Sequence, residues 1–337
     1  MAGLADALRQ FPPVAHAFAY GSSVFRQEGA PVSKDRMVDY ILVVDCPLKW
    51  HTANLQRNTH HYASYLRSLG PSAVTAVAEN IGVGVHFNSY VPWNQQILKY
   101  GVVSKETVLR DLREWTSLYI AGRLHKPVAH LVEDPDLLVA NAGNLRTAAT
   151  CALLLLPECF TEAELFHTIC GLSYSGDVRM GIAEDQRKVH RIAQGSQEPL
   201  RALYADVLAG PPAVRAALEF EEDSGARRFL QDTSPGARTE MIASLPVGML
   251  APLARLAGTS GLVAGSAGSE AAVDPGRAWE VGDRVAHSPQ CKELILGALQ
   301  CVVAASSRRQ AVSGALAAGS GNAMRYLAAK VSKAWKT

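Results

Sequence analysis

The sequence predicts a mixed α/β fold of the α+β kind, organised in two domains, and three observations support this prediction. Short apolar segments typical of strands alternate with segments of helical spacing through the first half of the chain. After Pro127, helix-forming segments dominate and strand patterns become sparse. The length of 337 residues exceeds what one hydrophobic core usually organises.

Two apolar segments near the start of the chain predict neighbouring buried strands. The first begins at Val14, in VAHAFAY, and runs into a Gly-Ser turn; the second, MVDYILVVD, covers residues 37–45. Both are short apolar runs bounded by polar or turn-forming residues, which is the pattern of strands in a core. The first domain therefore opens on two strands joined by a polar loop.

Helical and strand patterns then alternate up to residue 121. The predicted elements are, in order, a helix over 55–69, a helix over 71–80, a strand over 82–91, a strand over 99–104 and a helix over 105–121. Gly70-Pro71 closes the first of these helices. Alternation of apolar and small or polar residues in GVGVHFNSYV defines the first strand of this group. Ser104 is placed as the N-cap of the last helix.

The second half of the chain is mostly helical, with predicted helices over 137–156 and 162–172. Residues 258–276 are rich in Gly, Ala and Ser, have little apolar surface to bury, and are interpreted as a flexible linker. The predicted divisions are a first domain over 1–128, a helical domain over 129–257, the linker over 258–276 and a C-terminal segment over 277–337.

Composition and charge exclude several classes of protein. Apolar residues make up 48% and charged residues 19% of the chain, a balance typical of a globular protein. The net charge of +2 is too small for a protein that follows nucleic-acid phosphates, so we expect no nucleic-acid partner. The six cysteines form no C-x-x-C pair, which predicts free thiols in a reducing compartment.

The apolar runs of the sequence are too short to cross a membrane. The longest, over 148–157, is about half the length that a bilayer-spanning helix needs. The first residues lack both the apolar core of a secretory signal and the Arg-rich pattern of a transit peptide. We therefore expect internal targeting or a presequence outside this sequence.

Gly21-Ser22-Ser23 and Asp39 form the most informative constellation in the sequence. A Gly-Ser turn after a strand lets backbone N–H groups approach phosphate oxygens closely. An ionised carboxylate inside an apolar strand is costly unless a metal or another partner satisfies it. Such a carboxylate can hold magnesium, which neutralises charge as pyrophosphate departs. The turn alone is more often structural, but Asp39 favours a nucleotidyl-transfer site.

Several strings of the sequence resemble one known family, the mitochondrial translocator assembly and maintenance proteins, which are the mitochondrial phosphatidate cytidylyltransferases. The resemblance covers most of residues 15–190 and returns near 307–310 and in the C-terminal Lys/Trp tail. The strings that carry it are, in order, AYGSSVFRQEG, MVDYILVVD with PLKWH, LGP, GVGVHFNS, KYGVVS, LYIAGRLHKPV and GLSYSGDVRM.

The resemblance implies a fold and a reaction that the residue patterns alone do not show. It implies a polymerase-beta-type nucleotidyltransferase domain followed by a helical, winged-helix-like domain, with CTP and Mg²⁺ in the cleft between them. The implied reaction joins CTP and phosphatidic acid to give CDP-diacylglycerol and pyrophosphate. The alternative is a non-enzymatic assembly factor of the mitochondrial protein import machinery, as the family's name suggests.

The resemblance also assigns roles to the turn and the strand described above. Gly21, Ser22 and Ser23 match the family's phosphate-binding turn, although Ser23 stands where a glycine is common. Asp39 matches the first metal carboxylate of the superfamily. The usual second carboxylate, two residues on and on the same face of the strand, is here Ile41. Another acid must therefore complete the metal site.

The motif GLSYSGDVRM contains the best candidate for the second acid. Its members Tyr174, Ser175, Gly176, Asp177 and Arg179 cluster around a predicted turn and are assigned to the nucleotide. Asp177 can reach the metal or the ribose hydroxyls, and Arg179 can bind a phosphate in a bidentate way. The alternative is an Asp/Arg pair on a surface turn.

Basic residues at the ends of predicted strands and helices are further candidates. Lys99 can stabilise charge on the transferring phosphoryl group, and Arg123 and Lys126 can hold a triphosphate or the phosphatidate headgroup. His61 can deprotonate the attacking phosphate or can form a hydrogen bond in the core, and the two interpretations carry equal weight. Each cation alone is more often a solvated surface charge.

The C-terminal residues 322–337 predict a basic amphipathic helix. Apolar residues recur on one helical face and end at Trp335, while four Lys and Arg side chains supply charge. This pattern favours binding to an anionic bilayer surface, although a helix docked on the protein has a similar pattern. With the resemblance, it predicts a peripheral protein on the matrix side of the mitochondrial inner membrane, feeding cardiolipin synthesis. The sequence leaves a homo-oligomer open, and its weak charge argues against transfer to RNA.

Overall fold

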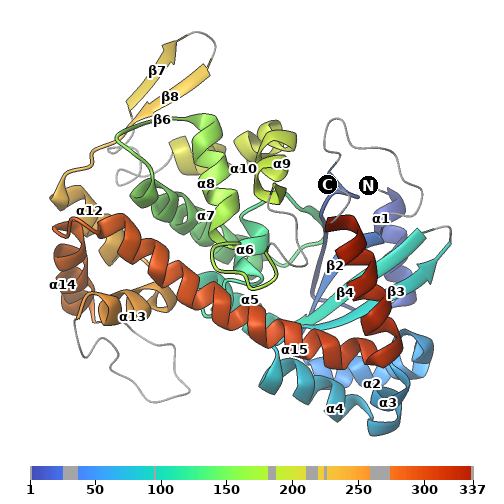
Figure 1. Ribbon diagram of the computed structural model, residues 1–337. Helices are drawn as coiled ribbons and strands as arrows, with labels where there is room; N and C mark the ends of the chain where they lie inside the picture. Colours follow the sequence, from blue (N-terminus) through green and yellow to red (C-terminus); the bar gives the residue numbers. More distant parts are fainter. Residues whose placement is uncertain are drawn as a thin grey trace.

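The computed structural model describes residues 2–25, 37–94, 96–180, 187–209, 219–223, 226–258 and 274–334. Its first half contains α1 (Ala2–Asp6), β1 (His16–Tyr20), β2 (Met37–Val44), α2 (Pro47–Arg57), α3 (Ser64–Leu69), α4 (Pro71–Ala76), β3 (His86–Trp93), β4 (Gln96–Ser104), α5 (Lys105–Glu114), α6 (Ala121–Leu124) and β5 (Ala129–Val132). Short 3₁₀ helices occupy Ala7–Gln10 and Thr59–His61, and a π-helix occupies Val77–Ile81. Figure 1 shows the arrangement.

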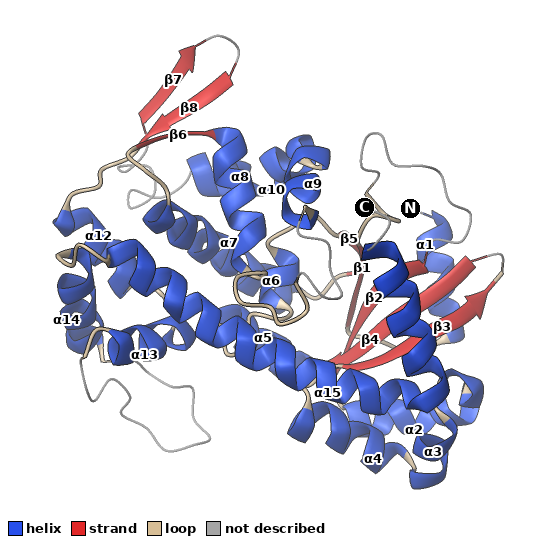
Figure 2. Cartoon of the chain, viewed as in Figure 1, coloured by secondary structure: helices blue, strands red, loops and turns tan. Residues whose placement is uncertain are grey.

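The second half contains α7 (Pro135–Leu155), β6 (Cys159–Thr161), α8 (Glu162–Leu172), α9 (Lys188–Gly195), α10 (Gln197–Ala209), β7 (Glu219–Asp223), β8 (Ala226–Leu230), α12 (Pro235–Ala243), α13 (Val247–Leu256), α14 (Pro275–Ala286) and α15 (Cys291–Ala334). Figure 2 shows helices dominating this half, with a small sheet in the order β6-β8-β7 projecting from it. The predicted α+β class is confirmed.

The central sheet has five strands in the order β3-β4-β2-β1-β5. β2 and β4 run parallel, and the other neighbouring strands pair antiparallel. The register places Tyr20 of β1 opposite Asp39 of β2, and Asp39 opposite Lys99 of β4. Because strand side chains alternate between faces, these three residues lie on the same face of the sheet.

The two faces of the sheet pack against different parts of the chain. On one face, Tyr40 and its neighbours form a core with Phe11 and Trp50 from the N-terminal elements. On the other face, Ile41 and Val43 join a larger core that continues into the helical half. The face that carries Asp39 is therefore the face that meets the helices of the second half.

The predicted helix over 55–69 is wrong, because the structure divides this segment. α2 ends at Arg57, and Asn58 leaves the helical conformation with φ −132°. The side-chain amide of Asn58 donates to the carbonyl of Gln10 at 2.9 Å and to Asn54 Oδ1 at 2.8 Å. The bond to Gln10, which is distant in the sequence, competes with continuation of the helix, and α3 begins only at Ser64.

The predicted helix after Ser104 forms, but it is shorter than the predicted 105–121. Ser104 is its N-cap and accepts a hydrogen bond from Thr107 N–H. The helix ends at Glu114 because Trp115 adopts a left-handed conformation with φ 53° and is fully buried. The carboxylate of Asp111 then accepts backbone N–H groups from the loop over 117–121, which the helical periodicity could not reveal.

The predicted helices over 137–156 and 162–172 are confirmed by α7 and α8. Asp134 caps α7 by accepting from the N–H groups of Asp136 and Leu137. Thr161 and Glu164 form a reciprocal capping box at the start of α8. Each start has the capping residue that local sequence rules favour.

α15 is the longest helix of the described chain and links its two halves. It packs against α13 and α7 in the helical half, and against β3 and α3 beside the sheet. Figure 1 shows it crossing the molecule from α14 towards α4. Most of the predicted linker, 259–273, lies outside the described residues. In the part of the chain that is described, each helix is too short or too polar to span a bilayer.

Candidate functional site

Asp39 and Lys99 form an ion pair on adjacent strands at the centre of the site. Lys99 Nζ lies 3.1 Å from Asp39 Oδ1, and their side chains are 17% and 28% exposed. The Lys99 ammonium also lies 4.6 Å from the ring centroid of Phe87 on β3. The carboxylate is thus balanced by a cation but still open to solvent, where a ligand can reach it.

The turn over Gly21, Ser22 and Ser23 begins directly beside this carboxylate. Gly21 has φ +89°, a conformation that L side chains rarely adopt, and a Cβ there would lie 3.6 Å from Asp39 Oδ2. Ser23 Oγ donates to the carbonyl of Met37 at 2.8 Å, which ties the turn to the start of β2. The serine at the position where glycine is common therefore has a structural partner.

Arg123 of α6 stacks between two tyrosines next to the ion pair. Its guanidinium carbon lies 4.4 Å from the ring centroid of Tyr20 and 5.0 Å from that of Tyr119. Burial acts to lower the pKa of Arg123, but the two phenols and Asp39 outweigh it and raise the pKa. Arg123 Nε and Tyr20 Oη are buried and have no hydrogen-bond partner among the described residues. Both can donate to an incoming ligand.

Lys126 extends this group of cations towards the loop after α8. Its Nζ donates to Ser173 Oγ at 2.8 Å and lies 5.1 Å from the ring centroid of Tyr174. Lys188 of α9 lies over the same ring at 5.3 Å. Burial, together with the charges of Arg123 and Lys188, lowers the pKa of Lys126. The local environment therefore favours a bound anion, which would relieve the repulsion between these cations.

Asp177 and Arg179 form a bidentate ion pair in the loop after α8. Arg179 Nε lies 2.9 Å from Asp177 Oδ1, and Arg179 Nη2 lies 2.6 Å from Asp177 Oδ2. The Asp177 side chain is only 1% exposed. Burial acts to lower the pKa of Arg179, but Asp177 and Tyr119 outweigh it and raise this pKa. The charge of Arg123 also acts to lower it. The loop therefore faces the cation group, but its carboxylate is held by its own arginine.

The sequence predicts that the neighbouring loop residues Tyr174, Ser175 and Gly176 bind the nucleotide. Ser175 Oγ donates to the carbonyl of Gly171 at 3.2 Å, within the end of α8. Gly176 has φ +81°, and a Cβ there would lie 3.0 Å from Gln300 Cα of α15. The ring of Tyr174 joins the cations through its contacts with Lys126 and Lys188. The structure thus brings Tyr174 and Arg179 to the group, while Ser175 bonds within its own turn.

His61 does not join this group, because it lies on the opposite face of the sheet. Its Nδ1 lies 2.9 Å from the hydroxyl of Tyr100, which also accepts hydrogen bonds from Asn54 and Asn88. Burial, with a smaller contribution from His60, lowers the pKa of His61 to about 4. The structure therefore places His61 in a buried polar network, as the core interpretation predicts.

Tyr20 and Tyr119 are the members of the site that sequence reasoning did not select. Tyr20 ends β1 immediately before the Gly-Ser turn, and this position beside a phosphate-binding turn could have indicated it. Tyr119 precedes Arg123 by four residues, but it lies in the irregular loop that follows α5. Only the folded arrangement shows that both rings hold one guanidinium.

Metal ligands are scarce around Asp39. In the described ranges, no group of three or more His, Cys, Asp or Glu side chains is arranged to hold a metal ion. Mg²⁺ commonly binds proteins through one or two carboxylates together with substrate phosphates. Asp39 fits this type of site, in which a bound triphosphate supplies the remaining oxygens. Asp177 can add a second carboxylate only if Arg179 is displaced from it.

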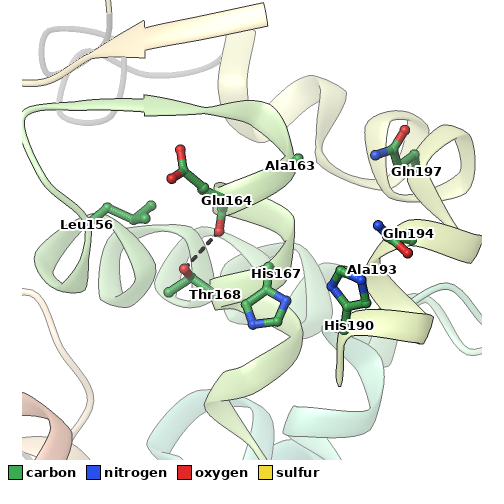
Figure 3. A pocket seen from close by; sticks show the side chains of 9 residues that line it. All are labelled: Leu156, Ala163, Glu164, His167, Thr168, His190, Ala193, Gln194 and Gln197. Carbon is green, nitrogen blue, oxygen red and sulfur yellow. Dashed lines mark hydrogen bonds between the residues drawn. The ribbon is translucent and has the colours of Figure 1, made fainter. Parts of the chain in front are cut away.

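A separate pocket of about 330 Å³ lies between α8, α9 and α10 (Figure 3). Thr168 Oγ1 donates to the carbonyl of Glu164 at its edge, and the ring centroids of His167 and His190 lie 6.1 Å apart. Its lining consists of Leu156, Ala163, Glu164, His167, Thr168, His190, Ala193, Gln194 and Gln197. The residues of the candidate site do not contribute to it.

The fold and the site together define a class of protein. An α+β chain that places a glycine turn and several cations around one strand-borne carboxylate is equipped to hold a phosphate-bearing ligand. The family described as "Phosphatidate cytidylyltransferase, mitochondrial" matches residues 4–333. The chain therefore belongs to the family of mitochondrial phosphatidate cytidylyltransferases.

Similarity to individual relatives extends over most of the chain. Proteins named mitochondrial phosphatidate cytidylyltransferase from Xenopus laevis and Bos taurus are 39% and 36% identical to it. These alignments cover 94% of this chain and 89% of the first relative, and 98% and 93% for the second. A Drosophila melanogaster relative of the same name is 41% identical over 251 residues, which cover 69% of this chain and 73% of that protein.

Proposed function

We propose that this protein is a phosphatidate cytidylyltransferase that forms CDP-diacylglycerol and pyrophosphate from CTP and phosphatidic acid. Membership of the family supports this activity. The single structural observation that carries it is the Asp39–Lys99 pair beside the Gly21 turn, with Arg123 stacked next to it. Such a set of groups can bind a triphosphate and balance the charge that its cleavage develops.

The reaction is a displacement at phosphorus. A phosphatidate oxygen forms a bond to the α-phosphorus of CTP, the bond from that phosphorus to the bridging oxygen breaks, and pyrophosphate leaves with the electron pair. We assign the backbone of Gly21, Ser22 and Ser23 to the triphosphate. Lys99 and Arg123 stabilise the charge that moves onto the leaving group.

The second substrate also needs cations, because the phosphatidate headgroup is an anion. We assign Lys126 to this headgroup, and Tyr174, Ser175, Gly176 and Arg179 to the nucleotide. The headgroup carries close to two charges near neutral pH, like other phosphate monoesters, so it attacks without a protein base. The proposed reaction therefore needs no proton acceptor at His61, which lies in the buried network with Tyr100.

We infer that the reaction uses Mg²⁺, held by Asp39 together with phosphate oxygens of CTP. When bound, the ion neutralises charge on the triphosphate and favours departure of pyrophosphate. Asp177 is the candidate for a second carboxylate. If Asp177 held the ion, Arg179 would be available to bind a phosphate.

We further infer peripheral attachment to the matrix side of the mitochondrial inner membrane, in support of cardiolipin synthesis. The relatives are named mitochondrial, and the described helices include none able to span a bilayer. The basic C-terminal helix supplies the contact with anionic lipid. Its backbone is helical to Ala334, while the side chains after residue 317 lie outside the description.

Incubation of the protein with labelled CTP, phosphatidate liposomes and Mg²⁺ tests the proposed function. We expect CDP-diacylglycerol and pyrophosphate in equal amounts, and a loss of at least about 100-fold in the rate for Asp39→Ala. Asp45→Ala is the matched control, because Asp45 is an exposed aspartate just beyond the other end of the same strand.

The outcomes separate the two functions considered. Product from the wild type and from Asp45→Ala, but not from Asp39→Ala, supports the enzyme and the site. Absence of product from folded wild-type protein, with several divalent metals tried, favours the non-enzymatic assembly factor.

A further inference from the structure

Among the buried polar side chains of α15, Ser307 and Gln310 form hydrogen bonds with segments outside their own helix. Ser307 and Gln310 are 2% and 5% exposed. Ser307 Oγ accepts a hydrogen bond from the backbone N–H of Val178 at 3.3 Å. The amide of Gln310 accepts from Val83 N–H at 3.4 Å and donates to the Val85 carbonyl at 3.3 Å. One face of α15 thus holds two segments that lie far apart in the sequence.

The first of these segments is the loop with the Asp177–Arg179 ion pair. Val178 lies between the two charged residues, so its bond to α15 acts on the backbone that positions both of them. Gly176 of the same loop packs directly on α15, and a Cβ there would lie in tight contact with Gln300. The placement of this loop therefore depends on α15.

The second segment, residues 83–85, directly precedes β3, the strand that contacts the cations of the site. Gln310 pairs with this segment through one donor and one acceptor, much as a neighbouring strand would. Phe87, at the start of β3, lies under the ammonium group of Lys99. The ring of Phe87 also lies 6.4 Å from that of Tyr119, which stacks on Arg123. Gln310 is thereby coupled to the opposite side of the site.

We propose that Ser307 and Gln310 are positioning residues for cytidylyl transfer. Through them, α15 sets the spacing between the Asp177–Arg179 loop and the side of the site that carries Lys99. Their hydrogen bonds join protein segments, so we assign them no contact with a substrate. The inference rests on the proposed function and adds to it the groups that hold the two sides in register. A misplacement of about 1 Å in such a site can reduce the rate about 100-fold.

The variants Ser307→Ala and Gln310→Met test this inference. Each keeps the approximate shape of the side chain and removes its hydrogen bonds. Ser306→Ala is the matched control, because Ser306 is also buried on α15 but bonds to Val303 within its own helix. We expect kcat to fall at least about tenfold in both variants, because the groups around the reacting phosphorus lose their spacing. The KM for CTP should rise in Ser307→Ala, because Tyr174 and Arg179 of the displaced loop are assigned to the nucleotide, whereas Ser306→Ala should change neither constant.

The kinetic results for these variants either support or overturn the positioning role of Ser307 and Gln310. A kcat within twofold of wild type in both variants overturns the inference. An equal loss in Ser306→Ala, or a loss explained by a lower fraction of folded protein at the assay temperature, reduces the role to stability and also overturns it. Ser307→Ala removes a single oxygen and carries the test alone if Gln310→Met does not fold. Absence of product from the wild type overturns the proposed function itself.

Discussion

At the residue scale, the environment of Arg123 determines what this side chain can do. Two tyrosine rings cover the guanidinium and hold it next to Asp39, while Nε keeps no partner among the described residues. Stacking restricts the rotamers of a long side chain before any ligand arrives. The fork of N–H donors is therefore oriented in advance, which lowers the entropic cost of binding a phosphate.

Replacement of Arg123 by lysine should impair the enzyme although the charge is kept. Lysine lacks the planar fork and stacks less well on Tyr20 and Tyr119, so we expect kcat/KM to fall about 10- to 100-fold. Steady-state kinetics with CTP and phosphatidate vesicles measure the effect. Arg110→Lys is the control, since Arg110 is an exposed residue of α5 paired with Glu106. Equal kcat/KM values for the two variants would contradict the role of the stacked guanidinium.

At the element scale, the helices beside the sheet are joined to it by a buried network of hydrogen bonds. His51 Nδ1 lies 2.8 Å from the Tyr62 hydroxyl, and His61 and Asn54 both bond to Tyr100 of β4. Burial is the main cause that lowers the pKa of His51, of His61 and of His86. These rings are therefore neutral in the folded protein at neutral pH.

This network predicts that acid destabilises the protein in a defined pH range. The pKa of His61 and of His86 is about 4 in the fold, against 6.5 for free histidine. Below pH 6.5 the unfolded chain binds protons that the folded chain does not, so the free energy of unfolding falls as the pH drops from 6.5 towards 4. Urea unfolding at several pH values measures this change in the free energy of unfolding. Stability that is constant across this range would contradict the prediction, and a His86→Gln variant should show a shallower slope.

At the scale of the whole molecule, α15 connects the helical half, the sheet and the C-terminus. The side chains of α15 are described as far as Ala317, which is 6% exposed. Beyond this point the sequence alone indicates the basic amphipathic helix. We therefore expect the described part of α15 to organise the site and the basic C-terminal part to bind lipid.

Truncation after residue 317 should separate these two roles. We expect the shortened protein to retain its melting temperature but to lose binding to vesicles that contain phosphatidate, because Arg325, Lys330, Lys333 and Lys336 are removed. Sedimentation with anionic vesicles measures binding, and neutral phosphatidylcholine vesicles are the control. Unchanged sedimentation would place the membrane contact elsewhere on the molecule.

Much of the fold could be predicted because its signals are local. The strand over 37–44, the part of β4 over 99–104, the Ser104 cap and the boundaries of α8 follow from periodicity and capping rules. The division of 55–69 could not be predicted, because Asn58 bonds to a carbonyl far away in the sequence. Local propensity is overridden where tertiary hydrogen bonds satisfy the backbone differently.

The class of fold, the turn at Gly21 and the position of Asp39 in a buried strand could be predicted from the sequence, because each depends on a short continuous pattern. The partners of these groups depend on the folded chain: Lys99 is paired through strand register, and Tyr20 through its contact with Arg123. The hydrogen bonds from α15 to Val178 and to Val83 likewise depend on the folded chain. These pairings depend on which distant segments the fold brings into contact, and the spacing of residues along the sequence does not predict such contacts.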